Sequence, residues 1–90
     1  MSDVKDAGVK IELQLFARLR EVCGNQARVW VEVAEGATPE DCFELLCTQF
    51  AAVRPFRGTL AVAVNEEYAA WDRGLQRGDA VTFIPPVSGG

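Results

Sequence analysis

Two segments near the start of the chain alternate apolar and polar residues. The first spans residues 9–15, and the second spans residues 28–33, where three valines alternate with Arg28, Trp30 and Glu32. A period of two is typical of a strand that buries one face. We therefore expect two strands that pair antiparallel and leave Trp30 partly exposed. The residues predicted to share the buried face are Val9, Ile11, Leu13, Leu15, Val29, Val31 and Val33.

The connection between these two strands begins after Phe16. Residues 17–23 suit a short helical turn. Gly24-Asn25 would end this turn because both residues tolerate a left-handed backbone.

A longer helix is predicted to start at Thr38. The Thr38 hydroxyl can act as an N-cap, Pro39 fits the first turn, and acidic residues there complement the helix dipole. Asp41 stands where a capping box prefers Glu or Gln, so that motif is only approximate. The residue before Pro55 is disfavoured in a helix, which predicts an end there. The apolar residues at helical spacing are Cys42, Phe43, Leu45, Leu46, Phe50 and Val53.

The rest of the chain predicts three more strands. Residues 59–64 form a continuous apolar run, which is typical of an interior strand covered on at least one face. Asn65-Glu66 would turn the chain into a short edge strand around Tyr68. A loop over residues 71–74 then leads to a final strand over residues 80–84.

The predicted order is strand, strand, helix, strand, short strand, strand. A helix that connects the second strand to an interior strand, on one face of a mixed sheet, is the β-grasp or ubiquitin-like arrangement. We therefore expect an α+β fold with a mixed sheet of four to five strands and one main helix. Residues 1–8 are polar and predict a flexible leader, residues 9–84 the domain, and residues 85–90 an extended C-terminal tail.

Composition narrows the possible functions of the 90 residues. A net charge of −4 argues against a nucleic-acid surface, and the lack of histidine removes the commonest general base near neutral pH. Cys23, Cys42 and Cys47 contain no Cys-x-x-Cys pair, so we expect reduced thiols and no metal site, with Cys42 and Cys47 packed as small apolar residues. No signal segment or membrane-spanning run is apparent, and we expect a cytoplasmic protein.

The sequence from residue 83 to residue 90 reads Phe-Ile-Pro-Pro-Val-Ser-Gly-Gly. Pro85 and Pro86 bias the chain toward an extended path, and Gly89 and Gly90 have no side chain to obstruct a narrow channel. The six residues from 85 to 90 could reach roughly 20 Å when extended. This pattern favours a tail that presents the Gly90 carboxylate to another protein as a substrate. An ordinary frayed end is the alternative.

Three features carry a resemblance to a known family. They are Phe16 to Glu21 after the first strand, Val64-Asn65 at the end of the interior strand, and the segment that leads from Leu75 and Gly78-Asp79 into the tail. In this order and spacing, they resemble the small, sulfur-carrying subunits of molybdopterin synthase. The resemblance covers the chain from about residue 9 to its end. The family often has an acidic residue where this chain has Ala80, and the leader has no counterpart in it.

The resemblance implies a sulfur-transfer scheme centred on Gly90. A ubiquitin-activating-type enzyme would use ATP to adenylate the Gly90 carboxylate, and sulfur from a sulfurtransferase would displace AMP to leave a thiocarboxylate. A dimeric large catalytic subunit would accept one tail per active site and pass the sulfur to a pterin precursor to form the molybdopterin dithiolene. Gly90 is the reacting residue, Gly89 gives clearance, and Pro85, Pro86, Val87 and Ser88 form the stalk. The acyl-adenylate and thiocarboxylate at Gly90 are the only bound groups implied, with no metal.

The surface that meets the partner is open to two interpretations. Phe83 would help to dock the partner if it lay on the exposed sheet face, whereas an aromatic residue in a strand more often belongs to the core. Arg18 and Arg20 would either meet acidic partner groups or remain solvated. Trp30 and Trp71 would likewise either contact a partner or pack against other parts of this chain.

Three other functions remain compatible with the sequence. A sulfur carrier for the thiamin thiazole or for transfer-RNA thiolation would use the same terminal chemistry. A ubiquitin-like modifier would join Gly90 to lysine amines, and a plain interaction domain would carry an inert tail. The stalk from Pro85 to Ser88 and the Phe16–Glu21 segment favour molybdopterin synthesis, but fold alone does not decide between these functions.

Overall fold

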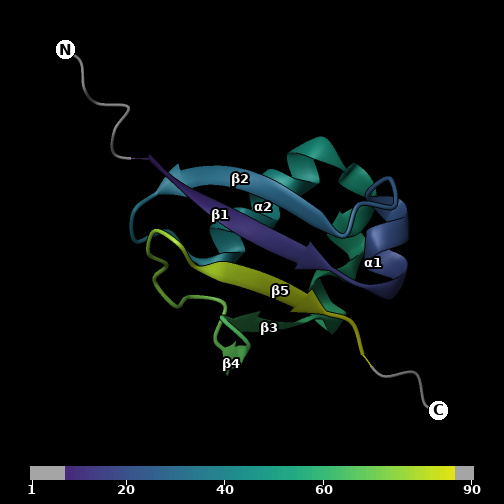
Figure 1. Cartoon of the computed structure of the whole chain (residues 1–90). Coiled ribbons are helices and arrows are strands. Elements are labelled where there is room, and N and C mark those ends of the chain that lie inside the picture. The colour runs from purple at the N-terminus through teal and green to yellow at the C-terminus, as the bar shows by residue number, and fades with distance from the viewer. Residues whose placement is uncertain (1–7, 87–90) are drawn as a thin grey trace.

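Five strands form one mixed sheet, and α2 packs across one of its faces (Figure 1). The computed structural model describes residues 8–86. The strands are β1 (Gly8–Leu15), β2 (Arg28–Ala34), β3 (Ala61–Val64), β4 (Glu67–Ala69) and β5 (Ala80–Ile84). The helices are α1 (Ala17–Val22), α2 (Pro39–Gln49) and the 3-10 helix η2 (Ala51–Thr59). All five predicted strands are confirmed, although the interior strand begins at Ala61 rather than at residue 59, because η2 extends to Thr59.

The sheet order is β2-β1-β5-β3-β4, so the first and last strands lie side by side in the middle. β1 and β5 run parallel, whereas the pairs β1/β2, β3/β5 and β3/β4 are antiparallel. Parallel neighbours end at the same edge of a sheet. The end of β5, from which the tail departs, is therefore beside the end of β1, which leads into α1 (Figure 1).

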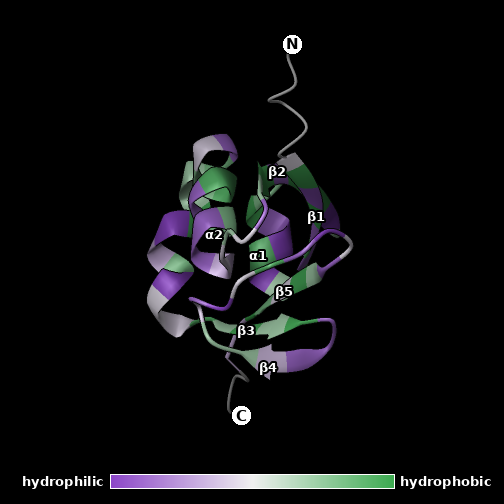
Figure 2. Cartoon of the chain, turned by 90° about the vertical axis from the view of Figure 1, so that its left-hand side faces the viewer, coloured by the Kyte–Doolittle hydropathy of each residue, from purple (hydrophilic) through white to green (hydrophobic). Residues whose placement is uncertain are grey.

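The core lies between the sheet and the helix layer, seen edge-on in Figure 2. Alternation along β1 and β2 turns their apolar residues toward this core, as predicted, and leaves Trp30 57% exposed. The strands contribute branched side chains, and α2 contributes Cys42, Phe43, Leu46 and Cys47. Burial of these apolar surfaces is the main stabilising contribution to a domain of this size.

The start of α2 is better capped than its sequence suggests. The backbone N–H of Asp41 donates to Thr38 Oγ1 at 3.2 Å, and the backbone N–H of Thr38 donates to Asp41 Oδ2 at 3.0 Å. The two residues form a complete capping box even though Asp41 replaces the longer Glu or Gln. The expectation that this motif is only approximate was therefore too cautious.

The predicted helix is divided into two segments. α2 ends at Gln49, Phe50 is non-helical, and η2 then carries the chain through Pro55 as far as Thr59. An α-helix cannot continue through proline without losing a hydrogen bond and clashing with the preceding turn. The 3-10 helix η2 still buries Val53 in the core. The predicted burial of Val53 is therefore correct, although the prediction that one α-helix reaches this residue is wrong.

The hairpin between β3 and β4 is tied to the start of β5. Asn65 and Glu66 have positive φ values of 52° and 73°, as a tight hairpin turn requires. The backbone N–H of Ala80 donates to Asn65 Oδ1 at 3.0 Å, and Asn65 Nδ2 donates to Asp79 Oδ1 at 2.9 Å. These bonds fix the point at which β5 begins. Among the described helices, none is long and apolar enough to cross a bilayer.

Candidate functional site

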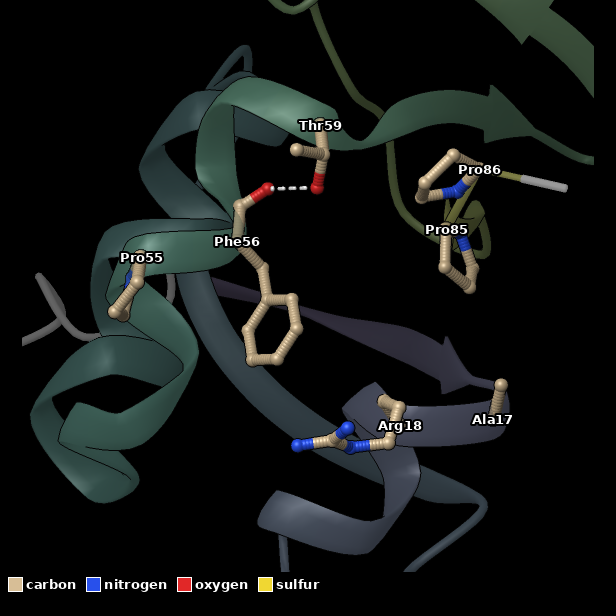
Figure 3. A pocket seen from close by; sticks show the side chains of 7 residues that line it. All are labelled: Ala17, Arg18, Pro55, Phe56, Thr59, Pro85 and Pro86. Atoms are coloured by element: carbon tan, nitrogen blue, oxygen red, sulfur yellow. Dashed lines mark hydrogen bonds between the residues drawn. The ribbon is translucent and has the colours of Figure 1, made fainter. Parts of the chain in front are cut away.

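The parallel pairing of β1 with β5 builds the surface around the root of the tail. Leu15 lies beside Phe83 in the register, so the residues after both strands emerge together. Ala17 has a φ of 54°, a left-handed value that is uncommon for a residue with a side chain, and it turns the chain sharply from β1 into α1. The turn brings the start of α1 close to Pro85 and Pro86 (Figure 3).

Phe83 is part of the core, so the interpretation that placed it on the exposed sheet face to dock a partner is wrong. Its side chain is 0% exposed. The register explains this burial, because Leu13 pairs with Val81 and Leu15 pairs with Phe83. Paired residues project from the same face of a sheet, so Phe83 must follow the buried leucines of β1. Ile84, the next residue, projects from the opposite face.

Trp71 holds Phe83 from the loop that follows β4. The two rings stack with centroids 5.6 Å apart, and Phe43 of α2 meets both of them edge-on. The Arg57 guanidinium lies 3.5 Å from the centroid of the Trp71 ring, and Arg57 Nε donates to Glu40 Oε1 at 3.0 Å. Trp71 is thus a structural residue that fixes the last strand against the helix layer.

The open face of the sheet carries an apolar patch beside the tail. Phe16 is 51% exposed and Tyr68 is 80% exposed, and between them lies a shallow hollow of about 410 Å³. At its base, Thr82 Oγ1 donates to Gln14 Oε1 at 3.0 Å. This patch was not predicted from the sequence. Because neighbouring residues of a strand face opposite sides of the sheet, Ile84 lies on this face and Phe83 does not. The residues that line the hollow are Gln14, Phe16, Ala63, Glu66, Tyr68, Thr82 and Ile84.

A second, deeper hollow opens beside the tail root (Figure 3). It has a volume of about 530 Å³ and lies between the start of α1, the end of η2 and the two prolines of the tail. The Phe56 ring projects into it, and the Arg18 side chain lies along the side formed by α1 (Figure 3). Its lining residues are Ala17, Arg18, Pro55, Phe56, Thr59, Pro85 and Pro86.

The remaining predicted site residues divide between the described part of the chain and the part beyond it. Pro85 is half-buried and Pro86 is exposed, and both border the deeper hollow. Val87, Ser88, Gly89 and Gly90 lie outside the described residues. The side chain of Arg18 is 71% exposed and lies 3.6 Å from Glu21, and Arg20 is exposed on the same helix.

The three cysteines are buried and uncharged near neutral pH. Burial raises the pKa of the Cys23 thiol to about 11 and that of Cys42 to about 12. Burial also raises the pKa of Cys47. A thiol attacks as its thiolate, so a raised pKa makes these cysteines poor nucleophiles. Within residues 8–86, no group of three or more metal-ligating side chains is found.

The sheet order, the single long helix and the projecting end of β5 define a ubiquitin-like β-grasp protein. Two solved structures share this fold over most of their length. Small archaeal modifier protein 1 from Haloferax volcanii superposes with a TM-score of 0.79 at 31% identity and covers 88% of this chain and 99% of its own. A molybdopterin converting factor subunit 1, described as putative, from Pyrococcus furiosus superposes with a TM-score of 0.77 at 30% identity, with the same two coverages of 88% and 99%.

Sequence comparison defines the family within this fold. The ThiS family matches residues 13–90, and the chain belongs to this family. The molybdopterin synthase sulfur carrier subunit of Arabidopsis thaliana is 33% identical over 84 residues, which cover 93% of this chain and 86% of the relative. The resemblance inferred from the Phe16–Glu21 segment and the tail is therefore confirmed.

Proposed function

We propose that this protein is the sulfur carrier subunit of a molybdopterin synthase, that it acts in the cytoplasm, and that the Gly90 carboxylate is its reacting group. The observation that carries the proposal is the match to the ThiS family, which extends through residue 90 and includes the whole tail. The name of the Arabidopsis relative supports the choice of molybdopterin synthesis. The three free cysteines are compatible with a reducing compartment.

The described residues support the delivery of a reactive tail rather than catalysis by this chain. β5 is anchored in the middle of the sheet, and Pro85 and Pro86 then restrict the backbone at the point where the chain leaves the domain. A carboxylate repels nucleophiles and must be activated before it can accept sulfur. An adenylating enzyme would use ATP to convert the Gly90 carboxylate to an acyl-adenylate with release of pyrophosphate, and sulfur from a sulfurtransferase would then displace AMP to give the thiocarboxylate.

The acceptor of the sulfur would be the large catalytic subunit. Thiocarboxylate sulfur is nucleophilic yet remains covalently attached, so it does not diffuse away between the two enzymes. Gly89 would let the tail enter a narrow channel, and the exposed Phe16 and Tyr68 would contact the partner beside the tail. Acid and base groups for the transfer would belong to the large subunit.

A second candidate is a protein modifier joined through Gly90 to lysine amines. The observation that favours it is the similarity to a small archaeal modifier protein, at 31% identity and a TM-score of 0.79. Both functions begin with an activated terminal carboxylate. They differ in the nucleophile that ends the reaction, which is sulfur for a carrier and a lysine amine for a modifier.

Intact-protein mass spectrometry after incubation with ATP, an adenylating enzyme and a sulfur donor tests the proposal. We expect one terminal oxygen to be replaced by sulfur, and we expect the loaded protein with the large subunit to convert the pterin precursor. A variant that lacks Gly90 is the control and should do neither. An unchanged mass with a competent adenylating enzyme would refute the carrier function. Gly-Gly remnants on lysines of other proteins would support the modifier.

A further inference from the structure

The hollow beside Pro85 and Pro86 is built to hold an apolar group. Its walls are formed by prolines, the Phe56 ring, the Ala17 methyl group and Thr59. The Thr59 hydroxyl donates to the Phe56 carbonyl oxygen at 2.8 Å, so its one proton is already used inside the protein (Figure 3). The interior of the hollow therefore offers few free polar groups that could bind water. An apolar side chain that displaced water from it would bind favourably.

One charged group stands at this hollow. The Arg18 side chain is 71% exposed and lies 3.6 Å from the Glu21 carboxylate, which is itself 64% exposed. Ion pairs between such exposed side chains contribute little to stability and exchange readily for another partner. Arg18 can therefore turn toward a carboxylate on an approaching protein without an appreciable cost to the fold.

The length of the tail limits how far a bound enzyme can lie from the hollow. This inference rests on the proposed function, in which Gly90 is the reacting group. Four residues follow Pro86 in the sequence, and fully extended they span at most about 14 Å. An enzyme that holds Gly90 in its active site must therefore come within that distance of Pro86. Because Pro85 and Pro86 form one wall of the hollow, the surface of that enzyme must also come close to the hollow.

We propose that the hollow receives one large apolar side chain of the large catalytic subunit, next to a carboxylate that pairs with Arg18. Side chains that fill a pocket near the centre of an interface commonly contribute most of its binding energy. The hollow is then a docking pocket that sets the position of the tail root while the tail enters the active site. It complements the apolar patch around Phe16 and Tyr68 beside the tail.

A pair of matched substitutions tests this assignment. Thr59→Trp places a large side chain in the hollow. Thr48→Trp, on α2, is the control, because Thr48 is exposed like Thr59. Its hydroxyl donates to the Leu45 carbonyl oxygen at 2.6 Å, so both threonines bond to the carbonyl three residues earlier. We expect Thr59→Trp to raise the Kd for the purified large subunit about tenfold or more, and Thr48→Trp to leave it unchanged. Urea unfolding of both variants checks that the fold is kept.

Charge reversal provides a second measurement. We expect Arg18→Glu to weaken binding to the large subunit and to reduce its dependence on salt. Arg20→Glu, on the same helix but outside the hollow, should have a smaller effect. Equal effects of the two reversals would overturn the role of Arg18.

The outcomes separate failure of the pocket from failure of the proposed function. Normal sulfur loading and normal binding by Thr59→Trp would overturn the pocket and leave the carrier function intact. A wild-type protein that neither loads sulfur nor binds the large subunit would refute both. A nuclear Overhauser effect between the Val87 methyl groups and the Phe56 ring in the free protein would show that the chain's own tail fills the hollow, and would also overturn the inference.

Discussion

The indole ring of Trp71 lies flat against the ring of Phe83, with the two planes inclined by 15°. Phe43 closes the cluster from α2, and Arg57 covers the other side of the indole. Aromatic contacts of this kind contribute beyond the area they bury. Phe83, two positions before the tail, is thus held in place by contacts that involve α2, η2 and the loop after β4.

Replacement of Phe83 by alanine should destabilise the protein strongly. Loss of a fully buried phenylalanine typically costs about 3–5 kcal/mol, which is a large part of the total stability of a small domain. Urea unfolding followed by circular dichroism measures this loss. Tyr68→Ala, at an 80% exposed position, should change the free energy of unfolding by less than about 0.5 kcal/mol. A Phe83→Ala protein with wild-type stability would contradict the place of Phe83 in the core.

The capping box at Thr38 gives a second stability prediction. Thr38→Ala removes the acceptor of the Asp41 backbone N–H and should lower the free energy of unfolding by about 1 kcal/mol. Thr48→Ala is the matched control, because its hydroxyl bonds within the helix and alanine suits a helix interior. Equal stabilities of the two variants in urea would show that the cap contributes nothing.

Most of the fold follows from local patterns in the sequence. Alternation in β1 and β2, the turn at Asn65-Glu66 and the cap at Thr38 each specify one element through interactions between near neighbours. Their order along the chain then restricts the sheet to few arrangements. The family resemblance came from short motifs whose spacing matches those same elements.

What could not be predicted depends on contacts between distant segments. Phe83 was ambiguous because its face is set by the register of β5 against β1, which joins residues far apart in the sequence. The break between α2 and η2 depends on how the chain passes Pro55 while Val53 stays buried. The deeper hollow forms only where α1, η2 and the tail root pack together, and the sequence of no single segment predicts that packing.

The apolar patch on the open face should matter for partner binding and not for stability. Phe16→Ser should weaken binding to the large subunit severalfold, because Phe16 is half exposed beside the tail. Trp30→Ser is the control, since Trp30 is similarly exposed but lies on the edge strand β2, opposite Glu12. Isothermal titration calorimetry compares the two. If Trp30→Ser weakens binding as much as Phe16→Ser, the docking face is wider than the surface around the tail.

The buried thiols predict a loss of stability in alkaline solution. An unfolded cysteine has a pKa near 8.5, whereas burial raises the folded pKa of Cys23 to about 11 and that of Cys42 to about 12. Above about pH 8.5 the unfolded chain releases these protons while the folded chain keeps them. The folded state then binds more protons than the unfolded state, so the free energy of unfolding must fall as pH rises toward 11.

Urea unfolding at pH 8 and pH 10 measures this effect, and Cys42→Ala separates it from other titrations. The variant should be less stable at pH 8 because it leaves a cavity, yet its stability should fall less steeply between the two pH values because one buried thiol is gone. A chemical probe gives an independent reading: iodoacetamide should label the folded protein slowly at pH 8.5 and rapidly once urea unfolds it. Rapid labelling of the folded protein at pH 8.5 would mean that at least one thiol is accessible and ionised, contrary to its burial.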